Sequence, residues 1–299
     1  MSAVLPILLS LAVAQVSIDP YARSHVAGAN SHCLWWHDGN VVYSQSQSGY
    51  PPLHGNEFAA VTRAWSSWQA IQDRCGNLTL SEGPRSAERK IGYDQNSSNN
   101  DNLILFRTML CSRVVPPGDS CSTSNPPTCN NKYDCWQDRD GLTIALTTTT
   151  FSVNTGRILD ADVELNGASA TIHFTAADGP RCTGGNFDNC VSTDVQSAMT
   201  HEFGHSLGLD HTNFPGSVMN PTAGNAEQQI AKRTIDPGSS DFICQAYPKG
   251  APSRDCIIDA ASSDLGVTHS GGCTSAAGIS WMSLAPLAIL LLLRARRQA

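Results

Sequence analysis

The eleven residues 201–211, with the sequence HEFGHSLGLDH, decide the fold and the chemistry expected of this chain. His201 and His205 are four positions apart, so on a helix their rings project from one face about one turn apart and can bind one metal ion. Glu202 lies one step round the helix, where its carboxylate can reach a metal-bound water without binding the metal. The spacing therefore predicts a helix that carries two metal ligands and a general base.

The chain after His205 supplies the rest of a catalytic zinc site. Gly208 can adopt the left-handed backbone conformation that ends a helix, and the chain then turns back so that His211 becomes a third ligand. Three protein ligands leave one position of a tetrahedral zinc ion open for water, and zinc lowers the pKa of that water to about 7. Met219, in the turn of residues 217–221, then forms a hydrophobic floor under the metal. We therefore expect one catalytic zinc on the three histidines.

A bare HExxH motif also occurs by chance in helices where the two histidines and the glutamate are only exposed to solvent. A chance motif in a structural cell-envelope protein does not account for Gly208, His211 and Met219 together. Another alternative is a non-catalytic surface adhesin that keeps zinc for stability. Glu202 argues against the adhesin, because a purely structural zinc site has no use for an open position or a base.

With these residues the sequence resembles the metzincin metallopeptidases, and among them Thr212, directly after the third histidine, resembles the Ser or Thr of the matrixins. The resemblance spans residues 31–248. Residues 56–71, with apolar side chains at helical spacing, look like the first helix of a matrixin catalytic domain, and residues 241–248 look like its closing helix. The resemblance implies an α+β fold with a twisted, mixed and mostly parallel sheet beside the active-site helix.

Four segments rich in Ile, Leu, Val and Thr predict strands of this sheet: residues 78–80, 103–106, 143–151 and 158–165. By resemblance, the edge strand around Ile144, Ala145 and Leu146 would bind an extended peptide by adding it to the sheet as a further strand. Residues 222–240 would then form the wall of the main specificity pocket.

The expected function is that of a zinc endopeptidase acting on protein or peptide substrates. In this hypothesis zinc polarises the scissile carbonyl, while Glu202 takes a proton from the bound water and passes it to the leaving amine. The net charge of −7 argues against nucleic acid or anionic lipid as partners.

The chain departs from the matrixin pattern at several positions. Only His173 is available for the second, structural zinc that vertebrate-type matrixins carry before the active-site helix, so we expect a single zinc. Residues 157–164 have carboxylates on alternate positions and hence on one strand face, which is either a calcium site or a solvated surface. Asn220 stands where matrixins usually have tyrosine, so no role of that tyrosine is carried over.

Cys75 lies in an Arg-Cys-Gly sequence that resembles the inhibitory switch of matrixin propeptides, in which a thiolate occupies the open zinc position. It follows the helix that belongs to the catalytic domain, and too few residues precede that domain for a folded propeptide. We therefore expect Cys75 to be a half-cystine.

Cysteine usage indicates an oxidising compartment. The chain has eleven cysteines, and setting aside Cys273 near the C-terminus leaves ten, an even number that predicts a disulfide framework. The expected local bridges are Cys182–Cys190 and Cys244–Cys256, and a loop that needs stapling contains Cys121, Cys129 and Cys135. Structural zinc on these cysteines is the alternative, but no paired CxxC spacing supports it.

The two ends of the chain indicate export. Residues 1–14 are typical of a cleaved secretory signal, with an apolar run before small residues. Residues 279–293 are mostly apolar and precede three arginines, which favours a stop-transfer anchor over the alternative of a buried C-terminal helix. Together with the Gly-Gly-Cys sequence before it, this tail resembles the sorting tails of myxobacterial surface proteins.

The expected organisation follows from these segments. It comprises a signal peptide (residues 1–14), a short N-terminal segment (15–30), the catalytic domain (31–248), a linker (249–272) and a sorting or anchor tail (273–299). The protein is then secreted or displayed at the cell surface, and the tail contacts the membrane before any cleavage.

Overall fold

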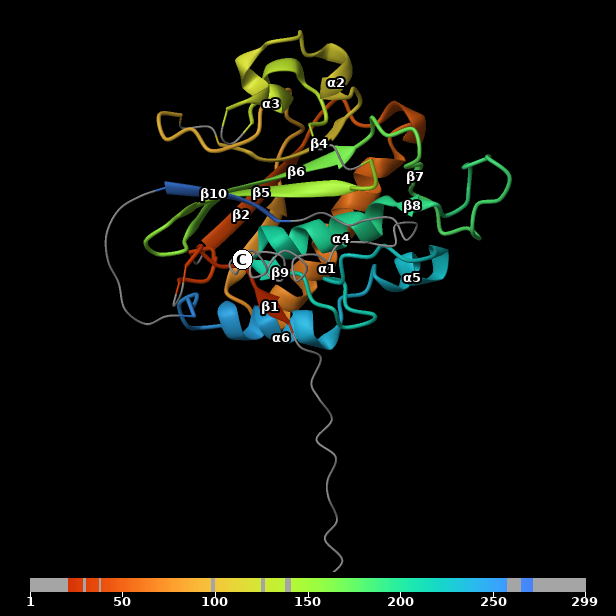
Figure 1. Ribbon diagram of the computed structural model, residues 1–299. Helices are drawn as coiled ribbons and strands as arrows, with labels where there is room; N and C mark the ends of the chain where they lie inside the picture. Colours follow the sequence, from red (N-terminus) through yellow and green to blue (C-terminus); the bar gives the residue numbers. More distant parts are fainter. Residues whose placement is uncertain are drawn as a thin grey trace, which may run out of the picture.

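The computed structural model describes residues 21–28, 31–37, 39–97, 100–124, 127–137, 141–256 and 265–270. The expected signal peptide and the tail of residues 273–299 lie outside this part of the chain. One central sheet separates two layers (Figure 1): the long helices lie against one face, and a cap of short helices covers the other. The fold is therefore mixed α+β, in agreement with the class expected from the sequence.

The central sheet has six strands in the order β10-β5-β6-β4-β2-β3. Parallel pairing joins β2 to β3 and to β4, and β4 to β6, whereas β5 and β10 run antiparallel to their neighbours. Their bounds are β2 Gly39–Gln45, β3 Leu78–Glu82, β4 Asn102–Arg107, β5 Ala145–Ser152, β6 Ile158–Asn166 and β10 Leu265–Ser270. The strands expected at 78–80, 103–106, 143–151 and 158–165 are confirmed within a few residues.

Two strands of this sheet, β2 and β10, have no counterpart among the expected ones. Strand β2 is short of apolar residues, yet it lies between β3 and β4 and buries Val41 and Tyr43. Four two-residue strands complete the ladders: β1 Ala22–Arg23, β7 Phe174–Thr175, β8 Thr193–Asp194 and β9 Leu209–Asp210.

Helices α1 Asn56–Cys75, α4 Val195–Ser206 and α6 Pro237–Ala246 form the layer on the first face. The buried residues of α1 recur at helical spacing, as expected, and include Ala60, Val61, Ala64, Trp65, Trp68 and Ile71. The Trp68 indole N–H donates to the Thr200 carbonyl at 3.0 Å and so fixes α1 against α4. The shorter helices are α2 Cys111–Val114, α3 Cys129–Tyr133 and α5 Ala226–Ala231, with 3-10 turns at Pro51–Leu53 and Ser120–Ser122.

Three aromatic side chains join the sheet to this helix layer. The ring of Trp65 lies 4.6 Å from that of Tyr43 and 4.3 Å from that of Phe203, measured between centroids. All three rings are buried, and aromatic side chains contribute 150–250 Å² of burial each, so this contact is a principal part of the core. This contact fixes the distance between the sheet and α4, the helix that carries the HEFGH sequence.

Five disulfides cross-link the described residues. They are Cys33–Cys256, Cys75–Cys244, Cys111–Cys135, Cys121–Cys129 and Cys182–Cys190. The local Cys182–Cys190 bridge is confirmed, and so is the expectation that Cys75 is a half-cystine. The predicted Cys244–Cys256 bridge is wrong, because α6 packs against α1 and brings Cys244 to Cys75 instead.

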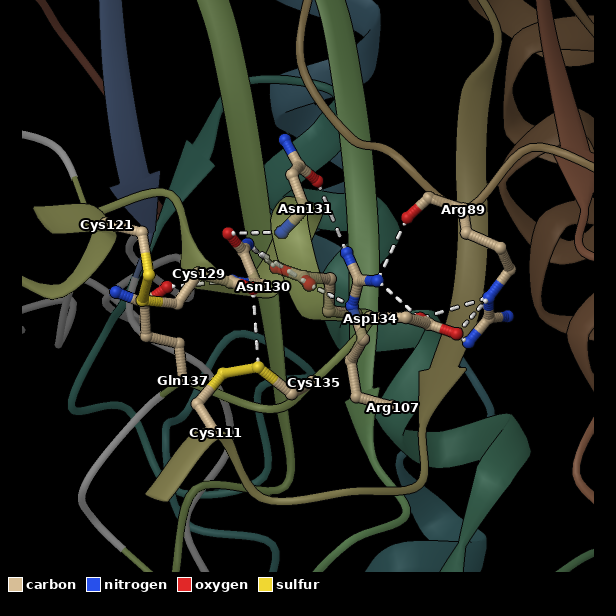
Figure 2. The surroundings of a disulfide bond; sticks show 11 residues. Arg89, Arg107, Cys111, Cys121, Cys129, Asn130, Asn131, Asp134, Cys135 and Gln137 are labelled. Carbon is tan, nitrogen blue, oxygen red and sulfur yellow. Dashed lines mark hydrogen bonds and ion pairs between the residues drawn. A yellow bond between two sulfur atoms is a disulfide. The ribbon is translucent and has the colours of Figure 1, made fainter. Parts of the chain in front are cut away.

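The cap on the second face consists of residues 111–124 and 127–137, closed by two of these disulfides. Figure 2 shows the fully buried Arg107 of β4 beside the cap, with its guanidinium toward Asp134 and the main chain of Arg89. The same guanidinium donates to Glu164 of β6 at 2.5 Å. The two disulfides therefore close the cap on itself, and the buried Arg107 joins it to the sheet.

Residues outside the expected catalytic domain also contact it. Lys249 donates its backbone N–H to the Cys75 carbonyl at 2.6 Å, and Arg254 donates to the Ala246 carbonyl at 2.6 Å. Within the described ranges, no helix is long and apolar enough to cross a membrane, and the apolar segment 279–293 lies outside them.

Candidate metal centre

The three histidines of the motif converge on one point. His201 and His205 project from α4, and His211 follows β9. Their Nε2 atoms form a nearly equilateral triangle: 3.0 Å separates the atoms of His201 and His205, and 3.1 Å separates each of them from that of His211. The structure thus brings together the three ligands that the spacing predicts.

Backbone carbonyls orient two of these rings. His201 Nδ1 lies 2.6 Å from the Val218 carbonyl, and His205 Nδ1 lies 2.8 Å from the Leu209 carbonyl. Because a carbonyl only accepts, each Nδ1 carries the proton, and each Nε2 lone pair points to the centre of the triangle. Burial, reinforced by the neighbouring His205 and His211, lowers the pKa of His201 well below its usual range, so its ring is neutral and able to bind a cation.

This donor set fits zinc. Neutral imidazoles whose Nε2 lone pairs converge cannot hydrogen-bond to each other, whereas a cation between them satisfies all three. Zn–N bonds of 2.0–2.1 Å in tetrahedral geometry place the nitrogens about 3.3 Å apart, close to the spacing found here. In the described part of the chain only one other group of potential ligands lies as close together, and its Cys33 and Cys256 are already joined in a disulfide.

Glu202 lies on the same helix and is completely buried. The Thr147 hydroxyl of β5 donates to its Oε2 at 2.7 Å and also approaches its main-chain carbonyl at 3.1 Å. The carboxylate is therefore held between α4 and the sheet. Thr147 is a positioning residue that the motif does not reveal, because it lies on a strand 55 residues away.

Met219, expected as the floor of the centre, packs against the helix that carries His201 and His205. It is completely buried, and its carbonyl accepts a hydrogen bond from the Thr212 backbone N–H at 3.1 Å. Its sulfur packs on the backbone of Gly204, where any added Cβ would collide with it. A larger residue at position 204 would therefore force the Met219 side chain to move, and the glycine in HEFGH is the sequence signal of this contact.

Asp236 holds the turn that carries Met219. Its Oδ2 accepts hydrogen bonds from the Ser217 hydroxyl at 3.1 Å and from the Val218 backbone N–H at 2.9 Å, while the same side chain caps α6. Since the Val218 carbonyl accepts from His201, Asp236 is connected to this expected metal ligand through a single residue, Val218. Sequence reasoning did not identify Asp236, because only the tertiary structure places it at this turn.

Gly208 ends the active-site helix as expected. Its φ of +99° lies in the left-handed region, and a Cβ there would be 2.5 Å from the Leu34 carbonyl oxygen. The Tyr247 hydroxyl donates to the Leu207 carbonyl at 2.6 Å, and the Trp36 indole donates to the Ser206 carbonyl at 2.7 Å. The last turn of α4 therefore has its carbonyls satisfied by side chains distant in sequence.

The residues expected to bind substrate lie at the start of β5. Ile144 and Ala145 are buried and Leu146 is half-buried, so little of their side-chain surface is accessible. A cavity of about 10 Å³ adjoins His201, lined in part by Ile144, Ala198, Ala223 and Lys232. Its lining includes residues of the expected specificity wall, 222–240. The cavity is barely large enough for one water molecule.

A much larger cavity, of about 1170 Å³, lies under the cap and includes Leu146 and Glu164 among its lining. Leu146 and Glu164 are cross-strand partners, so their side chains lie on the same face of the sheet. Glu202 lies on the opposite face, because it contacts Thr147, the next residue of β5. The larger cavity has no contact with the three histidines, so it lies apart from the candidate metal centre.

Two positions where the chain departs from the matrixin pattern have local partners. The His173 ring stacks on Phe187, with 3.9 Å between centroids. The Asn220 side-chain carbonyl accepts from the Thr222 N–H at 3.0 Å, and Lys232 Nζ donates to the main-chain carbonyls of both residues. Asn220 and Lys232 thus shape the loop beside the small cavity.

The alternating carboxylates of β6 are not a solvated surface. Asp160, Asp162 and Glu164 are 1, 1 and 4% exposed, because the cap and the loop before β4 cover this face. Asp162 accepts from the backbone N–H groups of Gly92 and Leu103, at 2.5 and 2.8 Å. Burial raises the pKa of Asp160 to about 6 and that of Asp162 well above its usual range.

Comparison with known proteins agrees with this geometry. The Matrixin family matches residues 136–241, a range that includes β5, β6 and the histidine motif. Matrilysin of Felis catus is 46% identical over 58 residues, which are 19% of this chain and 21% of that protein. Matrilysin of Homo sapiens is 51% identical over 57 residues, with the same two shares, 19% and 21%.

Matrilysin of Mus musculus is 72% identical over a shorter stretch of 25 residues, which are 8% of this chain and 10% of that protein. The chain therefore spans about a fifth of the length, or less, of the curated relatives that it matches. At the level of the family, these similarities support a matrixin-like metallopeptidase.

Proposed function

We propose that the protein is a secreted or surface-displayed zinc endopeptidase of the matrixin-like metzincins, which hydrolyses peptide bonds within protein or peptide substrates. The observation that carries this proposal is the convergence of three imidazole Nε2 atoms, 3.0–3.1 Å apart, next to the buried carboxylate of Glu202. Three neutral ligands and one base are what hydrolysis by a metal-activated water requires.

His201, His205 and His211 would hold the zinc ion. When bound, zinc supplies a Lewis acid that polarises the scissile carbonyl and lowers the pKa of water to about 7. Glu202 takes a proton from the attacking water and transfers it to the leaving amine. Thr147, which donates to Oε2, fixes the carboxylate during both transfers.

The substrate is proposed to bind in an extended conformation along the start of β5. Backbone groups at Ile144, Ala145 and Leu146 would pair with it as with an added strand, so affinity comes mainly from main-chain hydrogen bonds.

A non-catalytic adhesin on the same scaffold is the alternative. Burial of Glu202 against Thr147 speaks for catalysis, because an unused carboxylate in such a place only costs desolvation free energy. The cell-surface location and the membrane contact of residues 273–299 are proposals that rest on the sequence. A calcium ion on the β6 carboxylates is a further proposal, weakened by the bonds that Asp162 and Glu164 already make.

The test uses the purified full-length chain with a peptide library and metal analysis. We expect about one zinc per chain, cleavage of library peptides, loss of activity on removal of zinc with a chelator, and recovery when zinc is restored. Zinc-loaded protein that cleaves no peptide would favour the adhesin. A second tightly bound zinc would contradict the assignment of a single site.

A further inference from the structure

The outer edge of β5 is paired with the chain's own C-terminal segment. Strand β10 runs antiparallel along β5 from Leu265 opposite Ser152 to Ser270 opposite Thr147. Figure 1 shows β10 at the edge of the sheet, next to β5. The edge that would bind substrate by strand addition is therefore shared with a segment of the same chain.

The end of β10 lies at the catalytic centre. Ser270 is opposite Thr147, and Thr147 is the residue whose hydroxyl binds Glu202. The proposed substrate residues, Ile144 to Leu146, directly precede Thr147 on the same strand. A substrate strand that runs in the same sense as β10 would place its N-terminal part along Thr147 to Ser152, where β10 now lies.

A covalent link keeps this segment nearby. Cys256 is bonded to Cys33, and the adjacent Asp255 accepts a hydrogen bond from the Cys33 backbone N–H at 2.8 Å. Only nine positions separate Cys256 from Leu265. A short tether of this kind gives a segment an effective concentration in the millimolar range, so β10 competes even with abundant substrate.

We propose that Leu265–Ser270 is an intramolecular competitor that occupies the substrate edge of β5 and restricts access of extended substrates. One strand edge can pair with only one partner at a time, so binding of a long substrate requires displacement of β10. This inference rests on the proposed peptidase function. It assigns a regulatory role to the segment between the anchored Cys256 and the C-terminal tail.

If β10 competes for the strand edge, inhibition should depend on the length of the substrate peptide, whereas a general inhibitor would act on short and long peptides alike. A short peptide that pairs only with Ile144 to Leu146 does not overlap β10. A peptide extended at its N-terminal side by about five residues, each spanning roughly 3.4 Å, overlaps most of it. In the wild type, N-terminal extension of a substrate should therefore improve cleavage little.

The test is a pair of full-length variants. Val267→Pro with Thr268→Pro removes two consecutive backbone N–H donors. Successive N–H groups of a strand point to opposite edges of that strand, so one of the two donors that are lost must face β5. Val267→Ala with Thr268→Ala is the matched control, since it shortens the same side chains but keeps both N–H groups. Zinc content and thermal midpoint are measured for each protein to verify folding.

We expect the proline pair to raise kcat/KM about tenfold for the extended peptide, equivalent to roughly 1.4 kcal/mol, and less than about twofold for the short one. The alanine pair should remain near the wild type. An equal increase for both peptides, or no increase for the extended one, would overturn the proposal.

Hydrogen exchange separates this proposal from the peptidase function. Amides of Thr147 to Ser152 that point to β10 should be protected in the wild type and exchange faster in the proline pair, and a synthetic LGVTHS peptide should restore protection. This result would support strand occupancy even in a protein that cleaves nothing. Unprotected amides in the wild type would overturn the inference whatever the activity.

Discussion

The two faces of the central sheet are built on different principles. Two adjacent residues of β5 point to the two faces. Thr147 contacts Glu202 on the helix face. Leu146 faces the cap, as the cross-strand partner of Glu164. The helix face holds neutral histidines oriented by backbone carbonyls. The cap face buries charged side chains, among them Arg107 with Glu164.

This difference separates chemistry from stability. The metal centre depends on a continuous stretch of eleven residues together with contacts from Thr147 and Asp236. The cap depends on two disulfides within it and on the buried ion pairs of Arg107, which join distant segments. Substitutions on the helix face should therefore change the rate, and substitutions on the cap face should change the free energy of unfolding.

The largest effect is expected for Glu202→Ala. Removal of the base should lower kcat by at least about 10²–10⁴-fold, while about one zinc per chain remains because the ligands are intact. Steady-state kinetics and metal analysis on the same sample provide the measurement. Thr147→Val is the graded companion, with a smaller loss of kcat since only the orientation of the carboxylate is disturbed. Turnover in Glu202→Ala close to that of the wild type would refute the mechanism.

Arg107→Met tests the cap face. The guanidinium is completely buried and binds Glu164 and Asp134, so its removal leaves buried charge uncompensated and should cost about 3–5 kcal/mol of unfolding free energy. Urea unfolding measures the loss. Zinc content and kcat of the folded fraction should not change.

The control for this prediction is Arg85→Met. Arg85 is 38% exposed and lies 3.7 Å from Glu82, so its loss should cost less than about 1 kcal/mol. If Arg107→Met instead abolished zinc binding, the two faces would not be separable in the way proposed.

Cys75→Ser distinguishes a structural disulfide from an inhibitory switch. Loss of the Cys75–Cys244 bridge should lower stability by about 2–5 kcal/mol and leave activity without any increase. The matched variant is Cys182→Ser, whose bridge closes a separation of 8 residues instead of 169 and should therefore contribute less. A gain of activity in Cys75→Ser without loss of stability would assign the cysteine to latency.

The smallest effect is expected for Asp160→Asn. Burial raises the pKa of Asp160 to about 6, above its unfolded value of roughly 3.9, so the folded state binds more protons than the unfolded state between these values. Stability contributed by the protonated form is therefore present below about pH 4 and is lost as the pH rises through about 6.

Asparagine remains neutral at every pH and should stabilise the protein at pH 7–8 by on the order of 1–3 kcal/mol, with little gain at pH 4. Thermal unfolding across this pH range measures the difference. A gain that is the same at both ends of the range would show that Asp160 does not titrate as proposed.

Much of the metal centre could be predicted from the sequence. The spacing of His201 and His205 on one helix face, the position of Glu202 and the turn at Gly208 follow from helix geometry, which fixes where neighbours in sequence lie in space. The four strands expected from apolar segments were found for a similar reason, since period and composition are local properties.

The tertiary structure decided whatever joins distant segments. The bridge between Cys75 and Cys244, the carboxylate of Asp236 behind the Met219 turn, and β10 at the edge of β5 each involve partners that no spacing rule connects. Burial also excluded one of the two local interpretations of β6, a solvated face, because its alternating carboxylates lie under other segments of the chain. Helix and strand periods specify which face a side chain occupies, but packing of the whole chain specifies what that face meets.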